Sequence, residues 1–201
     1  MLSLSAKDSS FGHHIDRESS AGLMFRKRAI LVFALVILFV IPSIGKAEKP
    51  ELCDIIVTNT RDDLLLYFNA QGLFSADLKR AVLNGIPSKF TFFVSLYRVR
   101  YLWPDKELTK LEILHTIKYD SLRNEFTVVR SEYDRPVIVK SFARAMELMG
   151  SIDDFTVISM NDLPRGYHYQ IRLKAVLDRG SVPFPISWNI ETDWHSVDFI
   201  Y

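Results

Sequence analysis

The stretch from Pro87 to Trp103, PSKFTFFVSLYRVRYLW, constrains the fold more than any other part of the chain. It is long and apolar, and it contains no glycine and no interior proline. Every second residue from Phe90 to Leu96 lies on one apolar face, and the apolar side changes near Tyr97. Side chains of a strand alternate between two faces, and a change of side is typical of a long, twisted strand with a bulge. The stretch therefore predicts the central strand of a β-rich domain.

Alternating patterns predict further strands on both sides of this stretch. The clearest runs from Tyr167 to Leu177, where only Val176 departs from strict alternation. A turn is expected at Trp103-Pro104-Asp105 and a loop at Ser151–Asp154. The other expected strands are Cys53–Thr60, Leu64–Ala70, Leu108–Tyr119, Glu125–Arg130, Phe155–Met160, Ile186–Glu191 and Trp194–Tyr201.

Two short helices complete the pattern. Ser75 is a typical N-cap for a helix that ends at Asn84-Gly85. Residues 135–149 fit either a strand or a helix at their start, and we expect a short strand at Val137–Val139 and then a helix from Ser141 to Gly150. The fold class is thus mainly β, an antiparallel β-sandwich or a strongly curved sheet with two short helices, after an N-terminal signal segment.

The N-terminal region has the three parts of a secretory signal peptide. Arg26-Lys27-Arg28 precedes 13 apolar residues, 29–41, and small residues follow at Gly45 and Ala47. A membrane-spanning helix needs about 20 apolar residues, so this run is short for one. We expect residues 1–47 to be a leader that is cleaved after Ala47, and residues 48–201 to form one β-rich domain. We predict that Met24 is the true start, because a leader that begins there has ordinary proportions.

This leader predicts a periplasmic protein of the cell envelope. The alternative is an uncleaved segment that anchors the domain in the inner membrane with the same orientation, because the basic cluster stays inside. The net charge of +1 gives no indication of nucleic-acid binding. The single cysteine, Cys53, cannot form an internal disulfide, and we expect it to be a buried thiol on the first strand. Glu51-Leu52 before it do not fit a lipid-attachment signal.

No spaced catalytic or metal-binding motif is present in the sequence. His115, His168 and His195 are the histidines that follow the leader, and none has a second ligand at zinc-site spacing. Asp193 and His195 could share one strand face, although a solvated strand end explains them as well. We therefore predict no catalytic residues, no metal site and no cofactor.

The second half of the stretch from Pro87 to Trp103 is the candidate binding site. Arg98 and Arg100 share one predicted face, while Tyr97, Tyr101 and Trp103 share the other. A strand that is basic on one side and aromatic on the other could bind an anionic amphiphile, a glycan or a peptide edge. The alternative is an edge strand whose arginines prevent aggregation.

Several short segments resemble one protein family. These are Gly85-Ile86-Pro87-Ser88 before FTFFVSLYR, the pair Tyr119-Asp120, Leu163 with Gly166 and Tyr167 before IRLKAVLD, and the closing Thr192-Asp193-Trp194. Together they resemble the exported bacterial proteins grouped as domain of unknown function 4390, over most of the chain after the leader. This resemblance implies no activity and no catalytic residues. The family's genes often lie near that of a nitrogen-type sensor kinase, which implies a role in the envelope or in signalling.

Two functional classes follow from the sequence. The first is a non-enzymatic envelope module, a binding or signalling accessory whose partner is an envelope protein, a lipid or a glycan. The second is a periplasmic hydrolase that acts on envelope polymers. The hydrolase requires at least two of the histidines, Asp193 and the acidic turn residues to converge in one cleft. The lack of a spaced catalytic motif favours the first class.

Overall fold

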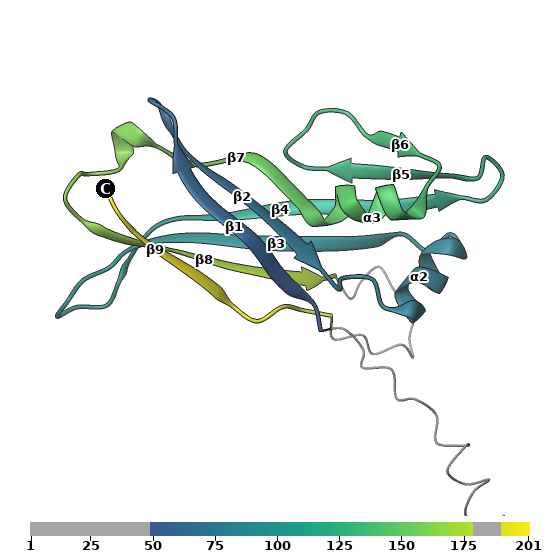
Figure 1. The fold of residues 1–201 in the computed structure, drawn as a ribbon, viewed down its shortest axis with the longest axis horizontal. Coiled ribbons are helices and arrows are strands. Elements are labelled where there is room, and N and C mark those ends of the chain that lie inside the picture. Colours follow the sequence, from purple (N-terminus) through teal and green to yellow (C-terminus); the bar gives the residue numbers. More distant parts are fainter. Residues whose placement is uncertain (1–48, 179–189) are drawn as a thin grey trace, which may run out of the picture. The chain divides into compact units, whose positions relative to one another are not determined.

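The computed structural model describes residues 49–178 and 190–201, and this part of the chain forms two antiparallel sheets and two α-helices (Figure 1). The strands are β1 (Glu51–Asn59), β2 (Asp63–Gln71), β3 (Ser88–Arg98), β4 (Lys106–Asp120), β5 (Glu125–Arg130), β6 (Val137–Val139), β7 (Ser151–Ser159), β8 (His168–Leu177) and β9 (His195–Ile200). The helices are α2 (Ala76–Leu83) and α3 (Phe142–Gly150), and a 3-10 turn, η1, spans Met160–Asp162. The expected leader, with its start and cleavage site, and most of the strand expected over 186–191 lie outside the described residues.

The larger sheet is built around β3, as the sequence predicts. Its six strands follow the order β6-β5-β4-β3-β8-β9, so β3 is hydrogen-bonded to a neighbour on both sides. The smaller sheet has the order β1-β2-β7. All pairings are antiparallel. The prediction of a mainly β, antiparallel fold with two short helices is confirmed.

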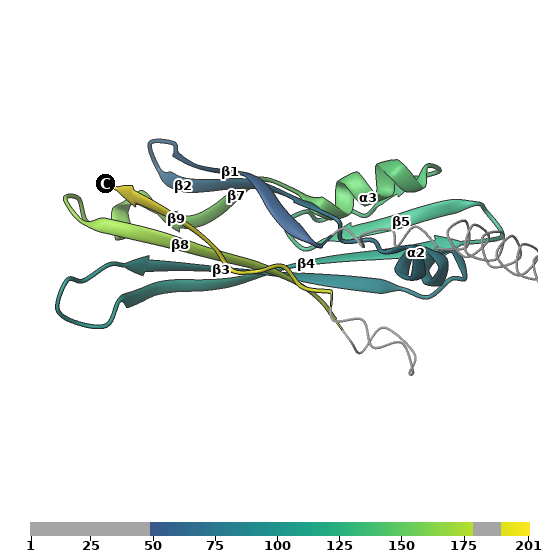
Figure 2. The ribbon, with the colours of Figure 1, turned by 60° about the horizontal axis from the view of Figure 1, so that its bottom comes forward.

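The apolar core lies between the two sheets and under the helices. The smaller sheet covers part of one face of the larger sheet (Figure 2), and the Phe68 and Phe92 rings meet edge to face between them at 5.6 Å. Nearer the start of β3, the Phe74 ring contacts both Phe90 and Phe142, and Phe142 is the first residue of α3. The β3 residues that face this core are at most 1% exposed, and burial of each such side chain stabilises the fold by about 1.5–3 kcal/mol.

Both helices begin where the sequence predicts. The Ser75 hydroxyl accepts a hydrogen bond from the Leu78 N–H, and the Ser141 hydroxyl accepts one from the Arg144 N–H. Such caps satisfy amide groups that have no partner within the helix. The short strand before Ser141 is confirmed as β6. Within residues 49–178 and 190–201, no helix has the length and apolar character needed to cross a membrane.

The loop expected at Ser151–Asp154 is wrong, because β7 begins at Ser151, directly after α3. Gly150 permits this tight junction, since a Cβ built on it would lie 2.5 Å from the Ala70 carbonyl oxygen of β2. Asp154 adopts a φ of 54°, and the pairing of β7 with β2 is irregular. Asp153 and Asp154 suggested a turn in the sequence, but in the structure they lie within an irregular strand.

Cys53 lies on the first strand, as expected, but it is only half-buried. The pairing of β1 with β2 shifts between Cys53 and Ile56, and Asp54 in between has a φ of 53°. Leu52 is the buried residue at this end of the strand, with 3% exposure. The irregularity thus changes which side chains of β1 face the core.

Candidate functional site

The loop between β3 and β4, residues 99–105, is named the hairpin tip (Figures 1 and 2). Its three consecutive large side chains, Tyr101, Leu102 and Trp103, are 99%, 81% and 73% exposed. The tip projects beyond the ends of the neighbouring strands at one end of the larger sheet. Side chains of this size and apolar character are normally buried, and neighbouring exposed ones mark interaction sites.

The predicted strand from Pro87 to Trp103 is too long, because β3 ends at Arg98. The bulge expected near Tyr97 is confirmed, since the pairing of β3 with β4 shifts between Leu96 and Tyr97. After Arg98 the chain leaves β4, and the Val99 N–H donates to the His168 carbonyl at 2.9 Å. The alternation of faces therefore stops at Arg98 and does not describe the hairpin tip.

The five predicted binding residues consequently fall into two groups. Tyr97 and Arg98 are half-buried at the end of β3, whereas Arg100, Tyr101 and Trp103 lie in the loop. The two arginines do not share a strand face with each other, and the three aromatic residues do not form one strand face either, because the strand geometry ends between the groups. Leu102 joins the loop group, although it was not among the predicted binding residues.

The groups at the base of the hairpin tip are occupied by contacts within the protein. The Tyr97 hydroxyl donates to a Glu107 carboxylate oxygen at 2.9 Å, and this hydrogen bond raises the pKa of Tyr97 above its ordinary value. The Arg172 guanidinium lies over the Tyr97 ring at 4.3 Å. The same guanidinium donates to Asp105 at 2.7 Å. Both acidic groups near the tip, Asp105 and Glu107, are therefore partnered.

The cations near the hairpin tip differ from these acids. Arg98 lies over the Tyr167 ring at 4.7 Å, and no acid within residues 49–178 and 190–201 forms an ion pair with it. Arg100 and Lys106, which flank the apolar side chains, have no ion-pair partner in the part of the chain that the structure describes. The hairpin tip thus combines exposed aromatic surface with positive charge that no described acid neutralises.

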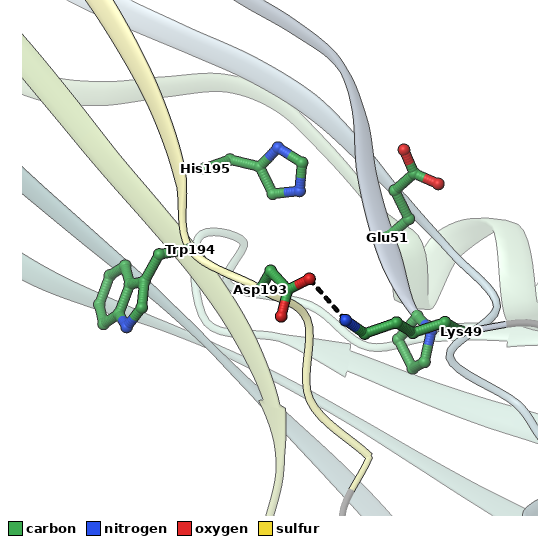
Figure 3. Close-up of a pocket in the computed structure, with 6 residues that line it drawn as sticks. Lys49, Glu51, Asp193, Trp194 and His195 are labelled. Atoms are coloured by element: carbon green, nitrogen blue, oxygen red, sulfur yellow. Dashed lines mark hydrogen bonds and ion pairs between the residues drawn. The ribbon is translucent and has the colours of Figure 1, made fainter.

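A second candidate site is a hollow of about 200 Å³ between the chain before β1 and the chain before β9. Lys49, Glu51, Asp193 and His195 are among the residues that line it. Asp193 and His195 extend to one side of the chain and Trp194 to the other, as alternation predicts (Figure 3). The Lys49 ammonium lies 2.5 Å from an Asp193 carboxylate oxygen, and this hydrogen bond lowers the pKa of Asp193.

The three histidines do not converge. His115 is fully buried, His168 lies 3.2 Å from Asp198 on the surface, and His195 lines the hollow in Figure 3. Only the pair Asp193 and His195 meets the requirement stated for a hydrolase, and that carboxylate is turned to Lys49. Among the described residues, no group of three or more His, Cys, Asp or Glu side chains could hold a metal ion.

No pattern in the sequence indicated the buried pair of His115 and Glu132. His115 Nδ1 lies 2.9 Å from the Met149 carbonyl oxygen, and Nε2 lies 2.8 Å from a Glu132 carboxylate oxygen. Both ring nitrogens therefore have a polar partner inside the protein. Neither nitrogen is then available to a substrate. Through these two contacts His115 joins β4 to the end of α3 and to the loop after β5, which serves the fold.

The comparisons with known proteins give one match. A family model, Domain of unknown function (DUF4390), matches residues 47–198. No curated protein and no solved structure matches the chain. The matched residues include both the hairpin tip and the hollow with Asp193 and His195. Because the match spans well over half of the sequence, this chain belongs to the DUF4390 family.

Proposed function

We propose that the chain is an exported, non-enzymatic binding module of the cell envelope, and that the hairpin tip is its contact surface. The signal-peptide pattern over residues 1–47 supports export. The observation that carries the binding role is the exposure of Tyr101, Leu102 and Trp103 at 99%, 81% and 73%. Most of the surface of these three side chains is uncovered in the described fold, so it is available to a partner.

The charge around the hairpin tip supports the same function. Arg100 and Lys106 have no ion-pair partner among residues 49–178 and 190–201, while Asp105 is bound to Arg172. An unpaired cation beside exposed aromatic rings can bind an anionic group and a ring or acyl surface together. An aggregation guard needs only the charge, and it does not account for three exposed apolar side chains.

Arginine substitutions at the hairpin tip test this function. Arg98→Ser combined with Arg100→Ser should remove bound mass that co-purifies with the protein from an exporting bacterial host, as measured by native mass spectrometry. The matched control is Arg123→Ser with Arg144→Ser, two exposed arginines outside the tip, which should leave the bound mass unchanged. Retention of every bound species by the Arg98/Arg100 variant would refute the hairpin tip as the contact surface.

A hydrolase acting on envelope polymers is the second candidate, favoured by the hollow that Glu51, Asp193 and His195 line. In it, His195 would need a carboxylate to orient it and act as acid or base. The Asp193 carboxylate is bound to Lys49, which does not favour that role. Peptidoglycan or glycan turnover by the purified chain that His195→Ala abolishes would support this candidate over the binding module.

A further inference from the structure

The chemistry of the hairpin tip is that of a membrane interface. Tyr and Trp concentrate at the level of lipid headgroups, where the ring is in an apolar layer and the polar atom remains hydrated. Here Tyr101 and Trp103 flank Leu102, whose side chain is wholly apolar and 81% exposed. The order aromatic, aliphatic, aromatic at a projecting loop can place one leucine below two interfacial rings without any change in the fold.

The charges next to the hairpin tip fit an anionic lipid surface. Arg100 precedes the three apolar residues and Lys106 follows the loop, so that each side of them carries one cation with no ion-pair partner among the described residues. Of the nearby acids, Asp105 is neutralised by its ion pair with Arg172, whereas Glu107 keeps its charge, since its partner is the neutral Tyr97 hydroxyl. The cations Arg98, Arg100 and Lys106 outnumber this one carboxylate. A basic residue near an anionic membrane surface strengthens binding by about fivefold.

The size and shape of the hairpin tip favour a lipid surface over a protein partner. Each aromatic side chain offers about 150–250 Å², whereas a stable protein interface buries about 800 Å² on each partner. Three side chains on a projecting loop do not reach that area. A lipid layer needs no complementary cavity and envelops a projecting tip from all sides.

We therefore propose that the hairpin tip inserts into an anionic phospholipid surface, with Leu102 among the acyl chains and with Arg100 and Lys106 at the phosphates. This inference rests on the proposed function, because it names the partner of the same contact surface. It predicts a reversible, salt-sensitive association, since the inserted apolar area is small and the charge contribution is screened.

Tryptophan fluorescence at the hairpin tip tests the inference. The chain has three tryptophans, so Trp188→Phe with Trp194→Phe leaves Trp103 as the only reporter. Vesicles of phosphatidylcholine and phosphatidylglycerol should shift its emission to the blue, and pure phosphatidylcholine vesicles should shift it far less. Arg100→Ser with Lys106→Ser in this background should weaken binding about 25-fold, since two charges are removed.

Sedimentation with the same vesicles gives a matched comparison. Tyr101→Ser/Leu102→Ser/Trp103→Ser should abolish binding, whereas Leu122→Ser, which removes an equally exposed leucine (96%) from the β4–β5 turn, should not. An unshifted Trp103 emission, equal binding to neutral vesicles, or full binding by the triple variant would overturn the lipid inference. If vesicles fail while the Arg98/Arg100 variant still loses a bound protein, the lipid inference fails and the proposed function stands.

Discussion

Both ends of the β3–β4 hairpin carry large aromatic residues, but these are buried at one end and exposed at the other. Near its start, β3 places Phe90 and Phe92 in the core, where they are at most 1% exposed and contact rings from other elements. At its far end, the hairpin tip holds Tyr101 and Trp103, which are 99% and 73% exposed. Aromatic residues stabilise this fold only where a second layer covers the sheet. Beyond that layer, large aromatic residues are exposed, and in our proposal they form the contact surface.

The polar groups differ in the same way. At the buried end, His115 beside Phe92 has both ring nitrogens in hydrogen bonds, to Met149 and Glu132. At the hairpin tip, the Arg100 side chain has no ion-pair partner among the residues described. A buried polar group needs a hydrogen-bond partner within the protein, whereas an exposed cation is hydrated and can bind an external anion. The comparison assigns stability to the buried end, and it is consistent with the binding role that we propose for the other end.

The largest effect is expected from Phe92→Ala, which would leave a cavity between the sheets at the contacts with Phe68 and His115. Truncation of a buried Phe destabilises a protein by about 3–5 kcal/mol. Urea denaturation measures this loss. If the free energy of unfolding changed by less than about 1 kcal/mol, the core would not lie where the structure places it.

Glu132→Ala should have the next largest effect, because it leaves the fully buried Nε2 of His115 without its partner. Removal of one member of a buried pair costs about 3 kcal/mol. The control is Glu147→Ala, which breaks an exposed pair with Arg144 and should cost about 0.5 kcal/mol. Equal losses of unfolding free energy in the two variants would show that the His115–Glu132 pair does not differ from a surface pair.

The same pair predicts a pH dependence. Burial raises the pKa of Glu132, but the hydrogen bond and charge of His115 outweigh burial and bring the pKa below the ordinary value of 4.5. The folded state thus has the lower pKa, so the stabilisation is present above about pH 4.5 and is lost as the pH falls through the folded pKa. Denaturation of the wild type and of Glu132→Gln at pH 7 and at acidic pH measures it. A stability difference between the two that does not shrink on acidification would contradict this prediction.

The smallest effect on stability is expected at the hairpin tip. Tyr101→Ser with Trp103→Ser removes side chains that are 99% and 73% exposed, and surface substitutions usually change the unfolding free energy by less than about 0.5 kcal/mol. The midpoint of thermal unfolding should therefore match the wild type. A clear drop would mean that the tip packs against the domain, and the distinction between the two ends would disappear.

Local patterns predicted much of the fold. The alternation from Tyr169 to Leu177 marks β8 because that strand is solvated on one face and buried on the other. Ser75 and Ser141 marked the helix starts because capping is a contact between residues three positions apart. The direction of the chain at Gly150 could not be predicted, since it depends on the approach of Ala70 from another strand.

The sequence predicted most of the residues that form the candidate site, but it did not predict that the strand ends at Arg98 and that a loop carries the rest of the site. The alternating pattern of residues continues beyond Arg98 in the sequence. In the structure, the backbone leaves β4 at this point, and the Val99 N–H donates to the His168 carbonyl oxygen on β8. Hydrogen bonding between distant strands leaves no trace in a local pattern. The pairing of His115 with Glu132 could not be predicted for the same reason, because the two residues are 17 positions apart in the sequence.

Photo-crosslinking in living cells tests the central claim most directly. A photoreactive amino acid is placed at position 102 of the full chain, and at position 122 as a control of similar exposure, since Leu102 and Leu122 are 81% and 96% exposed. Envelope adducts should form at position 102 and not at 122, and lipid adducts should predominate. Equal adduct formation at both positions, or none at 102, would contradict the assignment of the hairpin tip as the binding surface.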